Sequence, residues 1–140
     1  MRTYRSIPWI AEAHEKELYA YIHGYCKGVN ATLLRIGGMP DHVHILVSIP
    51  TSMAVAEFVR RLKNMATLWL KNNKAKFPLF DGWGEGYAAF SYSRFDVGKI
   101  KQYIMNQKEH HKRVSFADEY RQWLTENGVT IDEQYFLTDR

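Results

Sequence analysis

The sequence predicts an α+β fold, in which an antiparallel β-sheet is covered by helices mainly on one face. Two short apolar runs, 31–36 and 42–49, are separated by a Gly-Gly turn, as in a β-hairpin. Four other stretches repeat apolar residues at steps of three or four, which is typical of amphipathic helices. The expected order is helix, strand, strand, helix, strand, helix, helix. Because no long linker interrupts it, a single domain is expected over residues 1–140.

The composition is that of an ordinary globular protein with a basic charge balance. The chain is 46% hydrophobic and 24% charged, with a formal net charge of +4. A positive charge favours an acidic partner, and nucleic acid is the common one. The single cysteine, Cys26, excludes an internal disulfide and fits a reducing compartment. No apolar stretch approaches the roughly 18–20 residues of a membrane span. We therefore expect a cytoplasmic protein without a membrane partner.

The first two helices are predicted on either side of the hairpin. Pro8 stands where a first helical turn tolerates proline, and residues 9–26 then have the pattern of a helix that Gly28 would end. The second helix opens at residues 50–52 and runs to about Lys71. Its apolar stripe steps by three or four residues and consists of Val55, Phe58, Leu62, Met65 and Trp69.

Three further elements are predicted in the second half of the chain. After a loop that contains several glycines, residues 87–92 have the pattern of a short, aromatic-rich strand. Asp96 can cap a helix over 97–111. Ser115, followed three residues later by Asp118, resembles a capping box that opens a last helix.

Two histidines stand two residues apart at the start of the second apolar run. Because the side-chain period of a strand is two, His42 and His44 point to the same face. The opposite face of this strand is wholly apolar, so it is expected to be buried against helices. Such a pair can bind a metal ion. The alternative is that both imidazoles bond to core carbonyls or lie half exposed.

The helix predicted over 97–111 offers residues that could complete such a site. Tyr103 and Gln107 are four residues apart, so they are neighbours on one helical face. If this face packs on the histidine strand, His42, His44 and Gln107 can share a divalent cation with Tyr103 beside it. Imidazole and amide ligands leave positions on Mg²⁺ or Mn²⁺ open for phosphate oxygens, which suits phosphoryl transfer. In the alternative, the tyrosine is a packing residue and the glutamine a surface amide.

Two motifs resemble those of a known family. Residues 37–47 (Gly-Gly-Met-Pro-Asp-His-Val-His-Ile-Leu-Val) and 103–111 (Tyr-Ile-Met-Asn-Gln-Lys-Glu-His-His) are similar to the single-tyrosine HUH transposases of bacterial insertion sequences. This family includes transposases associated with repetitive extragenic palindromes. Residues 86–91 and 128–135 are also similar to the family. The resemblance runs from about Tyr4 to Phe136, nearly the whole chain.

The resemblance implies a role for each candidate residue. His42 and His44 match the metal-binding pair of the family, and Gln107 matches the third metal ligand. Tyr103 matches the nucleophile. Members of the family are homodimers that recognise subterminal hairpins and cut single-stranded DNA, which forms a 5′-phosphotyrosine and a free 3′-OH. That hydroxyl then rejoins the strands. In many members, the tyrosine helix of one subunit completes the metal site of the other.

The resemblance also implies a ferredoxin-like sheet, from which the first family strand is missing. Residues 1–5 resemble only the end of that strand or the loop after it. The sheet is therefore expected to have a gap, to rearrange, or to be filled by another chain. A truncated or domesticated copy that binds DNA hairpins without cleavage is the main alternative function. A second alternative function is that of a replication initiator or a relaxase. Those proteins usually place the two histidines after the nucleophile or use a third histidine, whereas here Tyr103 follows the histidine pair.

Two basic clusters are candidate DNA contacts. Arg60, Arg61 and Lys63 occupy polar faces of the second predicted helix, while Lys112 and Arg113 follow the predicted nucleophile. Contacts of such residues with phosphate would make the affinity for DNA fall steeply with salt. The alternative is an ordinary solvated surface.

Overall fold

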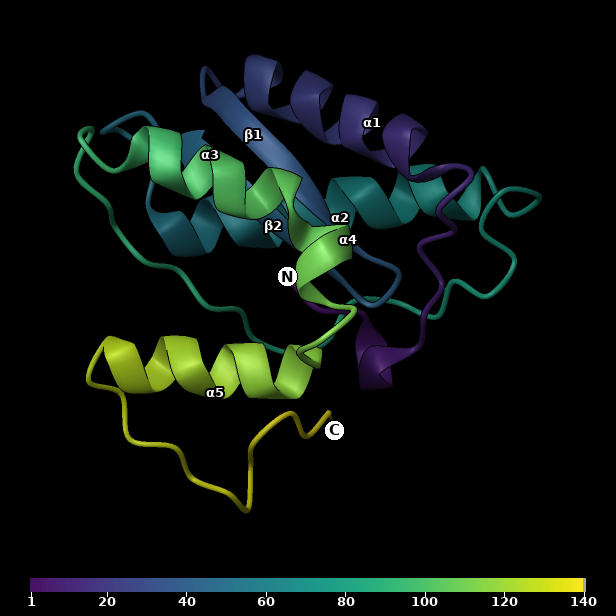
Figure 1. Cartoon of the computed structure of the whole chain (residues 1–140). Helices are drawn as coiled ribbons and strands as arrows, with labels where there is room; N and C mark the ends of the chain where they lie inside the picture. Colours follow the sequence, from purple (N-terminus) through teal and green to yellow (C-terminus); the bar gives the residue numbers. More distant parts are fainter. Residues whose placement is uncertain (140) are drawn as a thin grey trace.

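The computed structural model describes residues 1–139, and its centre is a hairpin of two antiparallel strands (Figure 1). β1 (Thr32–Met39) and β2 (His42–Ser48) pair from Met39 opposite His42 to Thr32 opposite Ser48, with one irregularity between Leu33 and Arg35. Near the end of β1, a Cβ on Gly38 would lie 2.2 Å from the carbonyl oxygen of His42, so only glycine fits there. The predicted antiparallel hairpin and the α+β fold are confirmed.

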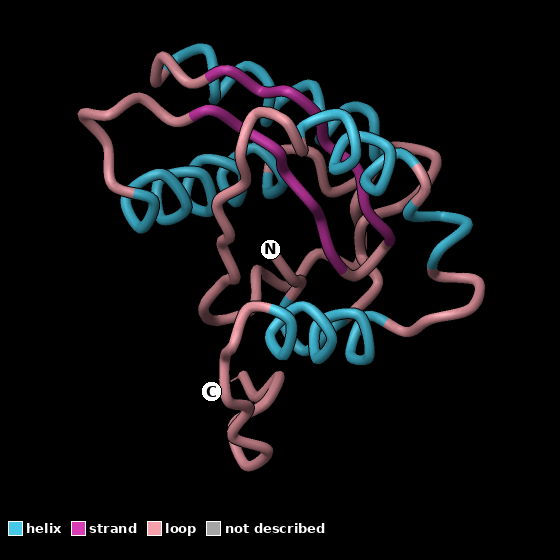
Figure 2. Tube along the Cα trace, turned by 60° about the vertical axis from the view of Figure 1, so that its left-hand side comes forward, coloured by secondary structure: helices cyan, strands magenta, loops and turns pink. Residues whose placement is uncertain are grey.

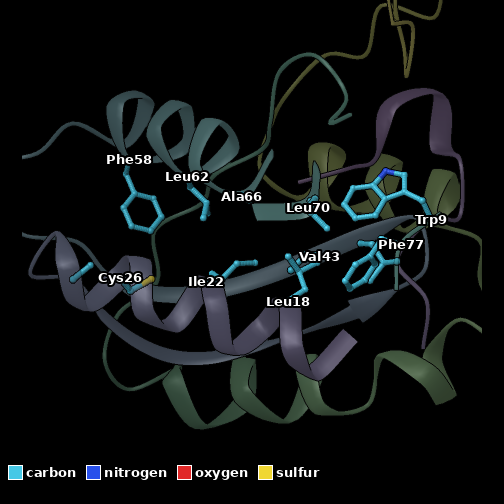
Figure 3. Packing of buried hydrophobic residues seen from close by; sticks show 12 residues of the cluster. Trp9, Leu18, Ile22, Cys26, Val43, Phe58, Leu62, Ala66, Leu70 and Phe77 are labelled. Carbon is cyan, nitrogen blue, oxygen red and sulfur yellow. The ribbon is translucent and has the colours of Figure 1, made fainter. Parts of the chain in front are cut away.

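The two longest helices, α1 (Glu15–Gly28) and α2 (Val55–Lys71), pack on the apolar face of the hairpin. Figure 3 shows their side chains meeting Val43 of β2 between the helices and the strands. The core so formed consists of Trp9, Ile10, Leu18, Ile22, Cys26, Ala31, Val43, Phe58, Leu62, Ala66, Leu70 and Phe77. The predicted apolar stripe of α2 is only partly buried, because Met65 is 46% and Val55 43% exposed.

The first helix begins later than predicted. Residues 9–14 do not belong to α1, which starts at Glu15. Trp9 is held instead by its indole, whose Nε1 donates a hydrogen bond to the carbonyl oxygen of Gly82 at 3.1 Å. The backbone N–H of Ile10 donates to the carbonyl oxygen of Pro40. These tertiary contacts hold the segment before Glu15 against the loop after α2 and the turn of the hairpin.

Shorter helices cover the other face of the hairpin. α3 (Val97–Met105) and α4 (Gln107–His110) lie over β1 and β2, and α5 (Phe116–Glu126) lies beside them (Figure 1). The single helix predicted over 97–111 is therefore wrong in its middle, because the backbone leaves helical geometry at Asn106 (φ −93°, ψ 14°). The predicted cap of α5 is confirmed, since Ser115 Oγ accepts a hydrogen bond from the N–H of Asp118.

The strand predicted over 87–92 is absent. These residues are irregular and mostly exposed, and they belong to the long loop that joins α2 to α3 (Figure 2). Their alternating pattern does not form a strand here because no neighbouring strand pairs with them in the described part of the chain. Tyr87 and Tyr92 are about two-fifths exposed, so neither ring is fixed by a core.

The N-terminal segment lies where a further strand would belong. Arg2 forms an antiparallel bridge with His42, and Thr3 forms one with Trp83. Met1 and Val43 exchange two backbone hydrogen bonds, of 2.8 and 2.9 Å. A 3₁₀ turn, Tyr4–Ser6, follows. The gap expected in the sheet is thus partly filled by this segment. Within the described residues, no helix has both the length and the apolar character of a membrane span.

Candidate metal centre

The two histidines of β2 point away from the apolar core. Val43, which lies between them, is buried in that core, so the alternation of the strand turns both imidazoles to the opposite face. His42 is 1% exposed, and its Nδ1 lies 2.7 Å from Asp41 Oδ1. The carboxylate accepts the hydrogen bond of Nδ1, which leaves Nε2 as the nitrogen that faces the site.

α3 and α4 bring the predicted tyrosine and glutamine to this histidine face. Gln107 is 1% exposed, and its Oε1 lies 3.0 Å from His42 Nε2. The ring of Tyr103 lies 5.9 Å from that of His44, centroid to centroid. The structure therefore gathers all four residues that the sequence singles out for chemistry.

A glycine allows α3 to come this close to the sheet. A Cβ on Gly37 would lie 2.8 Å from the carbonyl oxygen of Ile104, the residue that follows Tyr103. Any other residue would push the helix away from β1. The turn predicted at Gly37 and Gly38 lies instead at Pro40 and Asp41, and both glycines belong to β1, where Gly37 admits α3 and Gly38 lies tightly against β2.

Glu119 of α5 lies at the centre of the group, although no pattern in the sequence singles it out. Its side chain is 2% exposed. Oε1 lies 3.0 Å from His44 Nε2, and Oε2 accepts hydrogen bonds from Gln107 Nε2 at 3.2 Å and from the Tyr103 hydroxyl. Burial would raise the pKa of this carboxyl, but the hydrogen bonds from His44, Tyr103 and Gln107 outweigh burial and lower the pKa to about 2.

His111 is a second residue of the group that the sequence analysis did not assign to it. Its Nδ1 donates to the carbonyl oxygen of Val114 at 2.7 Å. Nε2 lies 3.0 Å from Gln107 Oε1 and 3.2 Å from Glu119 Oε2. In the sequence, His111 belongs to the motif over residues 103–111 but is not among the predicted metal ligands. His111 follows Gln107 by four residues, so the same helical spacing that pairs Gln107 with Tyr103 was the signal that could have found it.

The combined group has the donor set of a divalent metal. The ligand atoms of His42, His44, His111 and Glu119 all lie within 4.8 Å of one another. Imidazole nitrogens and carboxylate oxygens are ordinary ligands of Mn²⁺ and Zn²⁺, and the amide oxygen of Gln107 suits Mg²⁺ or Mn²⁺. The residues present therefore fit the divalent cation that the sequence predicts.

Burial controls the protonation of the site. It lowers the pKa of His44, although the neighbouring Glu119 opposes this effect, and it also lowers the pKa of His111. Neutral imidazole is the form that binds metals. The pKa of Tyr103 is raised mainly by burial and also by the hydrogen bond to Glu119. The phenol is therefore protonated in the resting state.

The predicted DNA-binding residues fall into two places. Arg60 and Arg61 are exposed on α2, which lies on the opposite face of the hairpin from the metal-ligand group. Lys63 is half-buried, and its Nζ donates to the carbonyl oxygens of Gly84 and Gly86.

Lys112 and Arg113 are exposed and directly follow His111. Lys112 forms an ion pair of 2.8 Å with Glu109, a contact between two exposed side chains. These two residues, and not those of α2, lie next to the candidate site.

A cavity of about 390 Å³ opens beside the group, with His44 and Glu119 in its wall. α5 lines it with Phe116, Tyr120 and Trp123, and the C-terminal segment contributes Phe136 among others. The lining thus combines aromatic and charged side chains next to the histidine and glutamate group.

Comparisons with known proteins identify similar chains. Residues 1–107 match the family model described as IS200-like transposase. The transposase for insertion sequence element IS200 of Salmonella typhimurium is 31% identical over 91 residues, which cover 62% of this chain and 59% of the relative. The ISDra2 transposase TnpA of Deinococcus radiodurans is 31% identical over 75 residues, covering 51% and 54%. The chain thus spans less than two thirds of the length of these curated relatives.

A solved structure has a similar fold. It is the crystal structure of a presumed transposase from Deinococcus radiodurans R1. The TM-score is 0.59 at 23% sequence identity, over 76% of this chain and 85% of the other. At this identity, the similarity concerns the fold alone. α5, with Glu119, lies beyond the residues that the family model matches.

Proposed function

Because this chain belongs to the IS200-like transposase family, we propose that it cleaves and rejoins single-stranded DNA through Tyr103. The observation that carries the proposal is the convergence of this tyrosine and His44 with the buried side chains of His42 and Gln107. Each of these residues can be assigned one part of a phosphoryl transfer. The proposed substrate is DNA whose element ends are marked by subterminal hairpins.

Cleavage is an in-line transfer of a phosphoryl group from deoxyribose to tyrosine. The Tyr103 oxygen forms a bond to the scissile phosphorus, and the 3′ oxygen leaves and takes up a proton to give a free 3′-OH. The phosphoryl group remains on the tyrosine as a 5′-phosphotyrosine. Because its pKa is raised, the phenol has to lose its proton as the bond forms. The hydroxyl donates to Glu119, which is the nearest acceptor for this proton.

The metal-binding residues support the same reaction. His42, His44 and Gln107 would hold Mg²⁺ or Mn²⁺, with the tautomer of His42 fixed by Asp41. When bound, the cation polarises the phosphoryl group and stabilises the negative charge that develops on it. Rejoining reverses the transfer, since a 3′-OH attacks the phosphotyrosine and the phenol regains its proton. No nucleotide hydrolysis is needed because one ester replaces another.

The proposed partners are single-stranded DNA and a second copy of the chain. The net charge of +4 supports an acidic partner. Lys112 and Arg113 are exposed beside the candidate site, where they could contact phosphates, while Arg60, Arg61 and Lys63 belong to α2. The homodimer rests on the family resemblance alone. A cytoplasmic location is consistent with the one free, buried cysteine.

The test is the formation of a covalent protein–DNA adduct. Labelled single-stranded DNA that carries the hairpins flanking the gene is incubated with the protein, with and without Mn²⁺, and separated on a denaturing protein gel. A metal-dependent adduct is expected for the wild type and for Tyr21→Phe, which removes a phenol remote from the site. The adduct should be lost in Tyr103→Phe, while hairpin binding persists. An adduct in Tyr103→Phe would contradict the proposal.

A second candidate is a copy that binds DNA hairpins without cutting them. It is favoured by the contact of Tyr103 with the buried Glu119, which holds the hydroxyl in place. Retained hairpin binding by the wild type, without any adduct in Mn²⁺, would establish this candidate.

A further inference from the structure

We propose that His111 and Glu119 are ligands of the same metal ion as the two histidines of β2. The inference rests on the proposed function, because it concerns the same cation, and it extends the metal site to α5. Neither residue belongs to the part of the chain that the family model matches, which ends at residue 107. The resulting centre has three imidazoles and one carboxylate beside the amide oxygen of Gln107.

The first argument is an excess of acceptors at the centre. His42 donates its Nδ1–H to Asp41, and His111 donates its Nδ1–H to the carbonyl oxygen of Val114. In each neutral ring, Nε2 then carries a lone pair. Both Nε2 atoms lie 3.0 Å from the same acceptor, Gln107 Oε1. Lone pairs that face one another at this distance repel, and a cation between them turns the repulsion into attraction.

Turning the amide of Gln107 over does not remove this excess. The amide nitrogen would then face the two imidazoles, but the amide oxygen would lie against Glu119 Oε2, which is 3.2 Å from the present nitrogen. Either orientation therefore leaves an acceptor facing an acceptor. A metal ion that takes up the imidazole and carboxylate lone pairs resolves the conflict in both orientations.

The distances fit one shared ion. Glu119 Oε1 lies 3.0 Å from His44 Nε2 and 3.7 Å from His42 Nε2, and Oε2 lies 3.2 Å from His111 Nε2. All the ligand atoms lie within 4.8 Å of one another. Ligands bound at about 2.0–2.2 Å on opposite sides of an ion are separated by about 4 Å, so small adjustments suffice.

The buried charge of the Glu119 carboxylate also favours a metal ion at the centre. Glu119 is 2% exposed, and its polar partners among the described residues are histidines, Tyr103 and Gln107, with no lysine or arginine. A buried carboxylate needs a positive partner. A divalent cation at the centre supplies that charge. Because three imidazoles favour first-row transition metals, the centre should prefer Mn²⁺, Co²⁺ or Zn²⁺ to Mg²⁺.

The test is metal binding, which does not depend on DNA cleavage. The metal-free full-length protein is titrated with Co²⁺, and the visible absorption of the bound ion gives the affinity and the ligand environment. Glu119→Gln and His111→Gln should each weaken binding by about tenfold or more. The matched controls, Glu126→Gln on α5 and His23→Gln on α1, remove exposed residues of the same types and should leave the affinity unchanged. Mg²⁺ in large excess should not displace Co²⁺.

Two outcomes would overturn the inference, and they differ in what they say of the proposed function. If either test variant binds Co²⁺ like the wild type while His42→Gln does not, the four-ligand centre is wrong and the site of the proposed function stands. If the wild type binds no Co²⁺ and no Mn²⁺, the metal dependence of the proposed function fails as well. Thermal unfolding of the metal-free variants identifies any variant that does not fold. If Glu119→Gln does not fold, Glu119→Asp replaces it, because aspartate keeps the carboxylate. Glu119→Asp should then bind Co²⁺ more tightly than a folded Glu119→Ala.

Discussion

Asp41 determines which nitrogen of His42 faces the candidate metal centre. Its carboxylate lies 2.7 Å from Nδ1, so the hydrogen of the neutral imidazole is held on the side away from the centre. Such outer contacts orient a metal ligand and increase its basicity. Asp41 precedes the first histidine directly, so this pairing depends on the turn of the hairpin as much as on the strand.

Replacing Asp41 should therefore weaken metal binding without removing a ligand. Asp41→Asn is expected to reduce the affinity for Mn²⁺ by about tenfold. The amide of asparagine can donate a hydrogen bond to Nδ1, so the hydrogen of the neutral ring is no longer held on Nδ1. The affinity can be measured by the loss of the electron paramagnetic resonance signal of free Mn²⁺. Asp81→Asn, an exposed carboxylate in the loop after α2, is the matched control. Equal affinities of Asp41→Asn and the wild type would show that the carboxylate does not orient the ring.

The sequence predicts the residues of the site unequally well. His42 and His44 follow from the alternation of one strand. Tyr103 and Gln107 follow from helical spacing, although the helix breaks between them at Asn106. Their convergence could be stated only as a condition, because it depends on which face α3 packs against. Glu119 lies twelve residues beyond Gln107 on another helix, so no local pattern connects them. The packing of α5 makes this glutamate part of the site.

At the scale of elements, the approach of α3 to β1 fixes the position of Tyr103. The contact depends on Gly37, where a Cβ would lie 2.8 Å from the carbonyl oxygen of Ile104. Gly37→Ala should push the helix outward and cost about 1–3 kcal/mol in the free energy of unfolding. The Tyr103–DNA adduct should fall as well. Urea denaturation and the adduct assay measure the two effects.

A second glycine provides the control for this prediction. Gly98 lies in α3 itself, and a Cβ there would meet nothing within 4 Å. Gly98→Ala should leave the adduct unchanged and raise stability by about 0.5–1 kcal/mol, because alanine loses less conformational freedom in a helix. If both variants lose stability alike, the close contact at Gly37 is not what positions α3.

Elements whose partners are close in sequence were predicted best. The hairpin, α2 and the Ser115 cap of α5 all depend on residues within a few positions of one another. The helix over 97–111 was predicted as continuous because its apolar spacing passes through Asn106 without a proline or glycine to mark the break. The strand over 87–92 was predicted from its aromatic alternation. A strand also needs a pairing edge, and whether one exists depends on the whole sheet.

At the scale of the whole molecule, the two ends of the described chain are joined. Arg2 binds both oxygens of Asp139 at 2.7 and 2.8 Å, and the backbone N–H groups of Arg5 and Glu85 donate to the same carboxylate. Figures 1 and 2 show the N-terminal and C-terminal segments close together beside α5. Arg2 also forms the bridge with His42. The ion pair therefore connects the C-terminal segment to the strand that carries the site.

The stability of the protein should depend on this ion pair and on pH. Both side chains are buried, so Asp139→Asn leaves the Arg2 guanidinium without a charged partner and should cost about 3 kcal/mol near pH 7. Burial opposes ionisation of Asp139, but the hydrogen bonds from Arg2, Arg5 and Glu85 prevail and lower its pKa.

A carboxyl whose pKa is lower in the folded state stabilises the protein above its unfolded pKa, about 4 for aspartate, and loses this effect as the pH falls toward the folded pKa. The difference in unfolding free energy between the wild type and Asp139→Asn should therefore be largest at neutral pH and shrink below about pH 4. Urea denaturation at several pH values measures it, with Asp132→Asn, an exposed carboxylate of the same segment, as the control. A difference that stays constant between neutral and acidic pH would mean that the charge of Asp139 is not what holds the two ends together.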